Sequence, residues 1–562
     1  MKKTILWAGL LVGACQALGL AMEKLETGKA ALLAALPFCA VTGAIWAAGT
    51  ALFFAGARMA GRRLLPDRLA YDPERALPGG WFAGIWIILF VSWIPCWLAY
   101  FPAIYSYDGE PQLIQYTTGA FDNHHPILHT LFLGGCYDLG KFLQEECGIP
   151  LDGMAFYALL QMLFLAFAFA CSISFLHRCG VRRSVLVAAI AWFALFPVHP
   201  LMAVTTTKDT LFAAFFLLAF VGLSRTMLLR KIGRFWEGTG LFLSALGMML
   251  FRKNGVYLMI GVCAVLFLVC AFSRWKKRGG FRFFSGLLLG CALCILTFFA
   301  CDAGLMAATG ARQGEAAEAL SIPIQQLART FKSNQNSLTP DEMESLCAYI
   351  PQKGLENYRP SISDGVKLYF NNERFAEDPA GFFRIWMHLL KKYPGSYATA
   401  FLYHTMGSWY LMDTSHCTVY KDWWRDRTGY FITDAVPVFA GDFVKKENLL
   451  PSVQNFYEAI ATGCVHQRFL PLRILFSPAF FCFCTAFCCL ALCLRRRSGL
   501  WLPCSAVLLY LATVVAGPCI LVRYIYPFMA LLPILAVLTL SGRGPVSLKG
   551  EKNGVLESAP SS

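Results

Sequence analysis

Long apolar runs separated by short polar segments make up most of this chain of 562 residues. A helix that crosses the hydrocarbon core of a bilayer needs about 20 mainly apolar residues. Runs of this length predict about twelve membrane-spanning helices, at residues 4–22, 30–57, 80–102, 153–176, 184–204, 209–228, 238–252, 255–273, 283–306, 472–494, 500–522 and 524–541. The pattern therefore predicts an all-α polytopic membrane protein.

Two polar stretches interrupt this pattern. Residues 103–152 follow the third predicted span, and residues 307–471 are the one long stretch of soluble character, rich in proline and aromatic residues. We expect the second stretch to form a mainly helical extracytoplasmic domain, with helices around 312–335, 341–350 and 379–411. The predicted units are two N-terminal spans with a loop (1–79), a core (80–306), the helical domain (307–471), the C-terminal spans (472–541) and a cytoplasmic tail expected to be disordered (542–562).

Composition and charge agree with a membrane location. Hydrophobic residues make up 57% of the chain and charged residues 15%, whereas about a quarter of an average soluble domain is charged. The positive-inside rule explains the formal net charge of +15, because the basic clusters fall in alternate loops. This orientation predicts a multi-pass protein of the cell membrane with both termini in the cytoplasm, and we expect no nucleic-acid partner.

The segment His124–Leu143 tests this topology. It is apolar enough to be considered as a span, but if it crossed the membrane, every later basic loop would lie outside, against the positive-inside rule. We therefore expect a helix that lies on, or dips into, the outer face of the membrane.

The loop after the third predicted span concentrates acidic and imidazole groups. Asp108 and Glu110 stand two apart, and His124, His125 and His129 follow within the same loop. A carboxylate here could act as a general base or hold a divalent cation; alternatively, Asp108 simply caps a helix. No Glu follows the first of the two histidines spaced four apart, so a zinc-protease helix is disfavoured. We expect chemistry at this loop, because a membrane protein keeps such groups where it binds or reacts with something.

Three outer turns carry basic residues and so break the positive-inside pattern. The residues at these turns are Lys208 with Asp209, Arg252 with Lys253, and Arg523 with Tyr524. A charge inside the membrane without a partner costs about 2–3 kcal/mol, and a phosphate held by basic side chains and a helix N-terminus would supply that partner. The alternative is that these side chains anchor helix ends at the membrane interface.

With these residues the chain resembles the GT-C superfamily of membrane glycosyltransferases, which use polyprenyl-phosphate-linked sugars. Members carry an acidic motif in a large first outer loop, where this chain has Asp108 and Glu110, and often a His-Pro-Pro-like segment further along, where it has His124-His125-Pro126. The resemblance covers most of residues 80–541, and the pattern is also similar to an uncharacterised family of bacterial membrane proteins. This chain departs from GT-C in its Asp-Gly-Glu spacing and in placing its polar domain between late spans, which leaves the acceptor class and metal dependence open.

The resemblance implies a GT-C-like core and an inverting sugar transfer from a polyprenyl-phosphate donor to a cell-envelope acceptor at the outer face of the membrane. Asp108 would take the proton of the acceptor, while Glu110 and His125 position the acceptor or the base. The other residues of the implied substrate and phosphate site are His124, His129, Lys208, Asp209, Arg252, Lys253, Arg523 and Tyr524. A divalent cation, Mg or Mn, is an option that would use Asp108 and Glu110.

Three other functions stay open at this point. A transporter or flippase of an anionic lipid-linked glycan would use the same cations as a substrate path, but no inverted repeat of the kind many transporters show is evident. A non-catalytic membrane protein would bind cell-wall polymers through residues 307–471. A different outer-leaflet transferase would need a nucleophile such as Ser106 or Thr207, and neither residue carries a recognisable signature.

Overall fold

The computed structural model describes most of the chain. The described residues are 2–66, 69–106, 108–149, 151–231, 235–276, 280–417, 429–433, 447–494, 499–541 and 547–548. The tail at 542–562, for which disorder is predicted, lies outside the described residues except for 547–548, which form strand β2 (Ser547–Leu548) parallel to β1 (Ala70–Tyr71).

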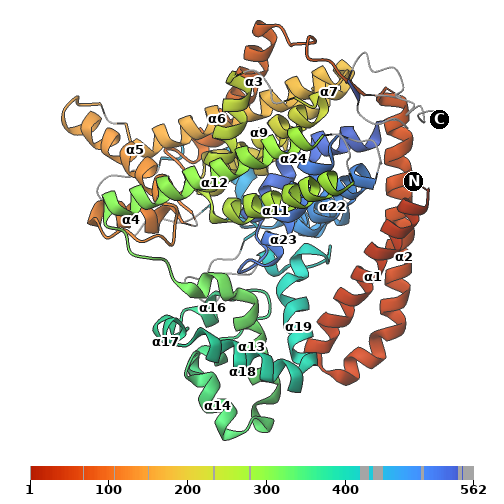
Figure 1. The fold of residues 1–562 in the computed structure, drawn as a ribbon, viewed down its shortest axis with the longest axis vertical. Coiled ribbons are helices and arrows are strands. Elements are labelled where there is room, and N and C mark those ends of the chain that lie inside the picture. Colours follow the sequence, from red (N-terminus) through yellow and green to blue (C-terminus); the bar gives the residue numbers. More distant parts are fainter. Residues whose placement is uncertain are drawn as a thin grey trace.

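Eight helices are long and apolar enough to cross a membrane. They are α1 (Lys2–Thr27), α2 (Lys29–Leu64), α3 (Gly79–Ala99), α6 (Gly153–Arg178), α9 (Lys208–Leu229), α11 (Lys253–Trp275), α12 (Phe281–Thr309) and α24 (Val522–Leu540). The described part of the chain holds up to ten such spans if two bent helix pairs are each counted as one. The prediction of an all-α multi-pass membrane protein is therefore confirmed, with α24 the most deeply buried candidate span (Figure 1).

Prolines explain the two bent pairs. One joins α7 (Arg183–Leu195) and α8 (Val198–Val204) at an angle of 53°, and the other joins α21 (Leu470–Phe476) and α22 (Pro478–Leu494) at 64°. Pro197 and Pro478 lie at these breaks, where the missing N–H and the ring prevent a continuous helix.

Two further apolar helices are shorter than the spans predicted for them. They are α10 (Phe235–Phe251) and α23 (Trp501–Val515). The segment 516–521 after α23 contains Gly517 and Pro518 and leaves the helix. A single extended residue, Arg252, joins α10 to α11.

The loop 103–152 folds as two helices beside the bundle. They are α4 (Gly109–Thr118) and α5 (Ile127–Glu145). α5 covers most of the segment expected at the membrane surface, and it is not among the candidate spans of the described residues. Its buried face contains His129 and Leu133 and packs on α6.

Residues 311–417 form a separate helical domain below the bundle (Figure 1). Its helices are η1 (Ala316–Leu320), α13 (Ser321–Asn334), η2 (Gln335–Ser337), α14 (Pro340–Cys347), α15 (Gln352–Glu356), α16 (Asp364–Lys367), α17 (Asn372–Glu377), α18 (Pro379–Lys392), α19 (Pro394–Thr405), η3 (Met406–Ser408) and η4 (Ser415–Cys417). Leu327, Leu346 and Phe382 lie in its own apolar core. The later segment with α20 (Pro451–Ala461) and η5 (Val465–Arg468) packs instead near the end of α3, where Leu449 N–H donates to the Leu98 carbonyl over 3.2 Å.

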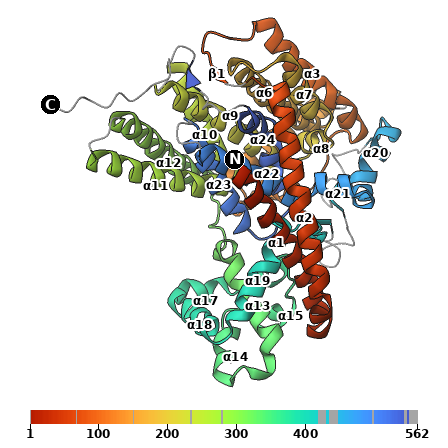
Figure 2. The same ribbon diagram turned by 90° about the vertical axis from the view of Figure 1, so that its right-hand side faces the viewer.

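The N-terminal hairpin connects the bundle to this domain. α1 and α2 pack closely, because a side chain on Gly13 would lie 2.3 Å from the carbonyl oxygen of Gly43. The hairpin runs along one side of the molecule and ends beside α19 (Figures 1 and 2). In the middle of α1, the buried Gln16 side chain donates to the Trp409 carbonyl and accepts from Leu411 N–H.

Candidate functional site

Two chain segments a hundred residues apart run side by side at one end of the bundle. Ile104 N–H donates to the Val204 carbonyl over 2.9 Å, and Thr206 N–H donates back to Ile104 over 2.9 Å. α4 begins directly after this pairing, and Gly109 at its start has no room for a side chain, because a Cβ would lie 2.3 Å from Thr206 Oγ1. The pairing brings Asp108 beside the start of α9.

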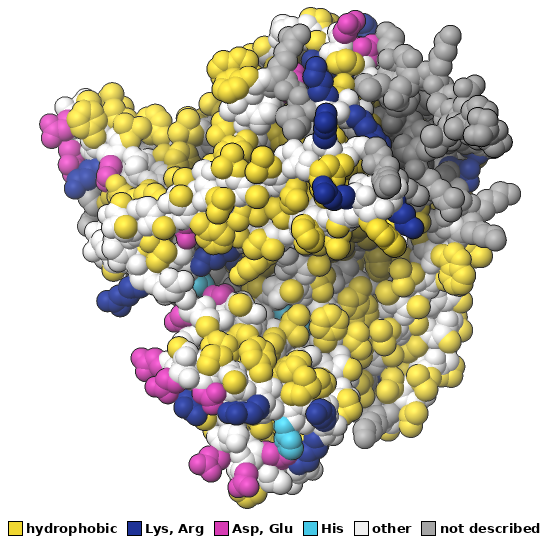
Figure 3. Space-filling view, in the orientation of Figure 1, with side chains coloured by type: hydrophobic (Ala, Val, Ile, Leu, Met, Phe, Trp, Pro, Cys, Tyr) yellow, Lys and Arg dark blue, Asp and Glu magenta, His cyan; other side chains and the backbone are white. Residues whose placement is uncertain are grey.

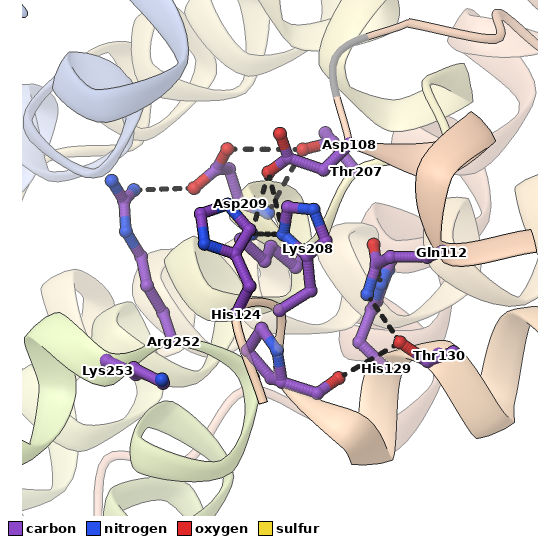
Figure 4. A network of polar contacts seen from close by, with 12 residues as sticks. Asp108, Gln112, His124, His129, Thr130, Thr207, Lys208, Asp209, Arg252 and Lys253 are labelled. Atoms are coloured by element: carbon purple, nitrogen blue, oxygen red, sulfur yellow. Dashed lines mark hydrogen bonds and ion pairs between the residues drawn. The ribbon is translucent and has the colours of Figure 1, made fainter. Parts of the chain in front are cut away.

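The carboxylate of Asp108 is held by two cations. Lys208 Nζ lies 2.7 Å and Arg523 Nη1 2.9 Å from its Oδ2 atom. Figure 4 shows Asp108 with Lys208 and Asp209 in the same network. Burial alone would raise the pKa of the Asp108 carboxyl, but Arg523 and Lys208 together outweigh this effect and hold the pKa well below its usual value. Asp108 is therefore a stable carboxylate and, in this arrangement, a weak base.

A second carboxylate, Asp209, lies fully buried behind the first. It faces Arg252 Nη1 at 2.5 Å and Arg523 Nη1 at 3.5 Å, and the Thr207 hydroxyl donates to it over 3.1 Å. Arg523 is therefore shared between both carboxylates. Three cations from α9, the α10–α11 turn and α24 meet two carboxylates in this cluster.

The ring of Tyr524 supports two of these cations. The guanidinium carbons of Arg252 and Arg523 lie 4.4 Å and 4.7 Å from its ring centroid, within the range of cation–π attraction. Arg523 also donates to the Tyr524 hydroxyl over 2.9 Å. Arg252 and Arg523 are both nearly buried, so these contacts replace much of their lost hydration.

The two neighbouring histidines have different environments. His125 is buried, and its Nδ1 accepts from Lys208 Nζ over 2.9 Å and lies 4.0 Å from Asp108 Oδ2. Burial, and next the Lys208 ammonium, lower the pKa of His125 well below its usual value, so its ring is neutral. His124 is partly exposed and lies 3.9 Å from Glu318 of the helical domain.

The remaining predicted site residues are His129 on α5, Glu110 on α4 and Lys253 on α11. His129 is fully buried, with Nδ1 2.8 Å from Gln112 Oε1 and Nε2 2.8 Å from the Tyr157 hydroxyl. Burial, and next the Lys208 charge, lower the pKa of His129 to about 3, so it is a neutral residue that ties α5 to α4 and α6. Glu110 is half-buried in the first turn of α4, and the ammonium of Lys253 donates to the Asn123 carbonyl.

The structure also identifies a supporting network that the sequence analysis did not name. The Tyr157 hydroxyl donates to Gln161, whose amide donates to the carbonyls of Met202, Ala203 and Thr205. This network fixes the segment that leads to Lys208. A glutamine four residues after a tyrosine in an otherwise apolar helix was the available signal, because buried polar groups need partners.

The residues present do not favour a metal at this position. Within the described residues no three His, Cys, Asp or Glu side chains are placed to hold a metal ion. Asp108, one of the two proposed ligands, already faces the positive charges of Lys208 and Arg523. We therefore derive no step through a metal.

A family model matches residues 111–546, which include Lys208, Asp209, Arg252 and Arg523 and begin just after Asp108. The chain belongs to the DUF6020 family, which is described as a family of unknown function. No curated protein and no solved structure matches the chain. The family description states no activity.

Replacing Gly109 by Ala should disturb the pairing between α4 and residues 204–206. The added Cβ would lie 2.3 Å from Thr206 Oγ1 and 2.6 Å from the Thr206 carbonyl oxygen, and such overpacking costs about 1–3 kcal/mol. We expect a lower melting temperature in lipid nanodiscs. The control is Gly135→Ala in α5, where no atom lies within 4 Å of the added Cβ; equal melting of both variants would contradict the expected clash.

Replacing Asp108 by Asn should destabilise the protein by about 3 kcal/mol, because it leaves Lys208 and Arg523 short of a buried counter-charge. The folded-state pKa of Asp108 is lowered, so its stabilisation is present above the unfolded carboxyl pKa and is lost as the pH falls through the folded-state value. The difference in melting temperature from wild type should therefore be constant from about pH 5 upward and shrink only in stronger acid. Asp138→Asn, at an exposed position of α5, is the control, and a loss equal to that of Asp108→Asn would contradict the account.

Proposed function

We propose that this protein is an integral membrane glycosyltransferase of GT-C type, which moves a sugar from a polyprenyl-phosphate donor to an acceptor at the outer face of the cell membrane. One observation carries the proposal: Lys208, Arg252 and Arg523 come from three parts of the chain and converge on Asp108 and Asp209 at one end of the bundle. The cluster contains acidic groups for proton transfer and basic groups for a phosphate.

The charge of the cluster suits a phosphodiester. Among the ion pairs of the described residues, two carboxylates face three cations, so these five groups carry one net positive charge. A buried charge without a counter-ion is costly, and a lipid phosphate esterified to a sugar carries a single negative charge. Binding such a phosphate would balance the cluster.

An apolar cavity supplies space for a part of the lipid chain of the donor. It has a volume of about 180 Å³ and is lined by side chains of α9, α10, α11, α12 and α23. Met248 and Leu258 are among its lining residues, and Met248 lies four residues before Arg252, about 6 Å along a helix. A prenyl chain in this cavity would therefore place its phosphate near the cations.

The orientation of the helices supports an outer location of the site. α9 and α11 begin at the site and run for 22 and 23 residues to the basic positions Arg230 and Lys276, about 33 Å away at 1.5 Å per residue. This length matches the hydrocarbon core of a bilayer. If the basic ends face the cytoplasm, the cluster lies at the outer surface and both termini lie inside.

The proposed reaction is a single displacement with inversion at the anomeric carbon. The acceptor oxygen forms a bond to this carbon, the bond to the phosphate oxygen breaks, and the lipid phosphate leaves with the electron pair. Asp108 takes the acceptor proton, while Glu110 and His125 position the acceptor. Lys208, Arg252 and Arg523 stabilise the charge on the leaving phosphate, as preorganised cations do.

Donor binding would also make Asp108 a better base. In the free protein Arg523 and Lys208 hold its pKa low. A phosphate between these cations brings a negative charge next to the carboxylate and shares its partners, and both effects raise a carboxyl pKa. The acid–base group would thus be activated only when the donor is present.

The helical domain lies where an acceptor could approach. His124 and Glu318 join the site loop to this domain. Figure 3 shows a hollow between the bundle and the domain, with basic, acidic and histidine side chains along its edges. A cell-envelope glycan, lipid or protein entering this hollow would reach the cluster from the polar side.

The Asp108→Asn variant tests the catalytic role. Loss of a general base typically lowers the rate by about 10²–10⁴-fold, whereas removal of a negative charge beside Lys208 and Arg523 should preserve or strengthen donor binding. We would measure single-turnover sugar transfer and donor affinity with the donor that the wild-type protein accepts. Asp138→Asn serves as the control, and wild-type transfer by Asp108→Asn would remove the assignment.

A cavity-filling variant tests the place of the lipid chain. Ala245→Trp projects into the cavity and should weaken binding of full-length polyprenyl phosphate by about tenfold, since about two buried CH₂ groups are worth this much. Binding of inorganic phosphate, which has no prenyl chain, should change less. Leu243→Trp on the exposed face of α10 is the matched control, and equal affinities for Ala245→Trp and wild type would argue against the cavity.

A further inference from the structure

The helical domain holds the segment that connects α23 to α24. Ser363 donates to the Pro518 carbonyl through its N–H over 3.0 Å and through its hydroxyl over 3.3 Å. Ile362 pairs with Cys519 in an antiparallel bridge, and both side chains are buried together with Leu521. A segment outside a helix lacks the helical hydrogen bonds, so these contacts from the domain fix its path.

His404 makes the contact at the start of this segment. Its Nε2 lies 2.7 Å from the Gly517 carbonyl oxygen, and its Nδ1 lies 3.4 Å from Gln325 Nε2. The carbonyl can only accept, so Nε2 carries the hydrogen and Nδ1 is the unprotonated nitrogen that faces the amide. The same Gln325 nitrogen donates to the carbonyls of Arg359 and Ile362 over 2.7 Å and 3.0 Å.

Both the position and the burial of His404 suit a fixed neutral donor. The residue is 2% exposed, and burial lowers its pKa although the Gly517 carbonyl opposes this shift. The Gly517 carbonyl, which can only accept, selects the tautomer with its hydrogen on Nε2. His404 therefore holds Gly517 in a defined place without a change of charge near neutral pH.

This segment leads directly to the shared cation of the site. Gly517 lies six residues before Arg523, which sits in the first turn of α24 and faces both Asp108 and Asp209. Tyr524, packed against the apolar contact of Cys519 and Leu521, follows it. A shift of Gly517 would therefore change where the Arg523 guanidinium lies.

We propose that His404 is a positioning residue for the donor-phosphate site and acts through Gly517 on Arg523. The inference rests on the proposed function, because it assigns Arg523 to the phosphate. The helical domain is then part of the donor site, although none of its residues joins the described ion-pair cluster. An acceptor that moves this domain would alter donor affinity through the same contact.

The test compares two replacements of His404 with different hydrogen-bonding ability. His404→Phe keeps a ring but loses the donor, whereas the amide of His404→Gln can still donate to Gly517. We would measure binding of polyprenyl phosphate to the full-length protein in phosphatidylcholine nanodiscs, and hydrogen exchange of the amides of residues 517–524. His388→Phe on the surface of α18, where His388 bonds Glu342, is the control.

We expect His404→Phe to bind polyprenyl phosphate about tenfold more weakly, the loss of roughly one good hydrogen bond. Exchange at residues 517–524 should be faster, and exchange in the core of α13 should be unchanged. His404→Gln should restore the affinity for polyprenyl phosphate and the slow exchange at residues 517–524. If the ring of His404 only filled space, the smaller Gln side chain would not restore them. If His404→Phe does not fold, Ser363→Ala, which removes one bond to Pro518, should show the same two changes to a smaller extent.

The Arg523→Gln variant distinguishes a failure of the proposed phosphate site from a failure of the positioning role of His404. If Arg523→Gln binds polyprenyl phosphate as well as wild type, the assignment of the phosphate site in the proposed function is wrong. Alternatively, Arg523→Gln binds polyprenyl phosphate weakly, while His404→Phe (or Ser363→Ala in its place) binds it like wild type and shows normal hydrogen exchange at residues 517–524. In that case the positioning role is wrong and the proposed function stands.

Discussion

The sharing of Arg523 between Asp108 and Asp209 is the interaction on which the site depends. Buried carboxylates and cations are tolerated only with close partners, so the elements that carry them must meet in one arrangement. The pairing of residues 104–106 with 204–206, the one-residue turn at Arg252 and the start of α24 all serve this requirement. Burying these charges costs desolvation free energy. A charged cluster that is nevertheless assembled from distant segments is typical of a site that binds or reacts with a ligand.

The shared arginine also explains why the helical domain matters for the membrane part. The link before α24 keeps hydrogen bonds to the end of α23 only as far as Gly517, and Ser363, Ile362 and His404 hold its residues 517–519. The tip of α1 packs on Tyr403 and Tyr410 of the same domain. The domain is therefore fixed to the membrane part at several places, and a change in its position would be transmitted through Gly517 to Arg523.

Much of this architecture could be predicted from the sequence. The long apolar runs predicted the helical multi-pass fold, and the basic residues that broke the positive-inside pattern, Lys208, Arg252 and Arg523, do meet at one site. The local signals could not show that Lys208 and Arg523 pair with Asp108, because these residues lie 100 and 415 positions from it along the chain. They also could not show that His129 is a buried structural residue, since its partners Gln112 and Tyr157 come from other helices.

The most direct test of the central claim is turnover by the wild-type protein in lipid nanodiscs with a panel of radiolabelled polyprenyl-phosphate sugars and envelope acceptors. The account predicts that one of these donors releases its lipid phosphate while the sugar appears on an acceptor with inverted anomeric configuration. Saturable binding of the donors without release of phosphate from any of them would contradict the account and favour a binding or transport function.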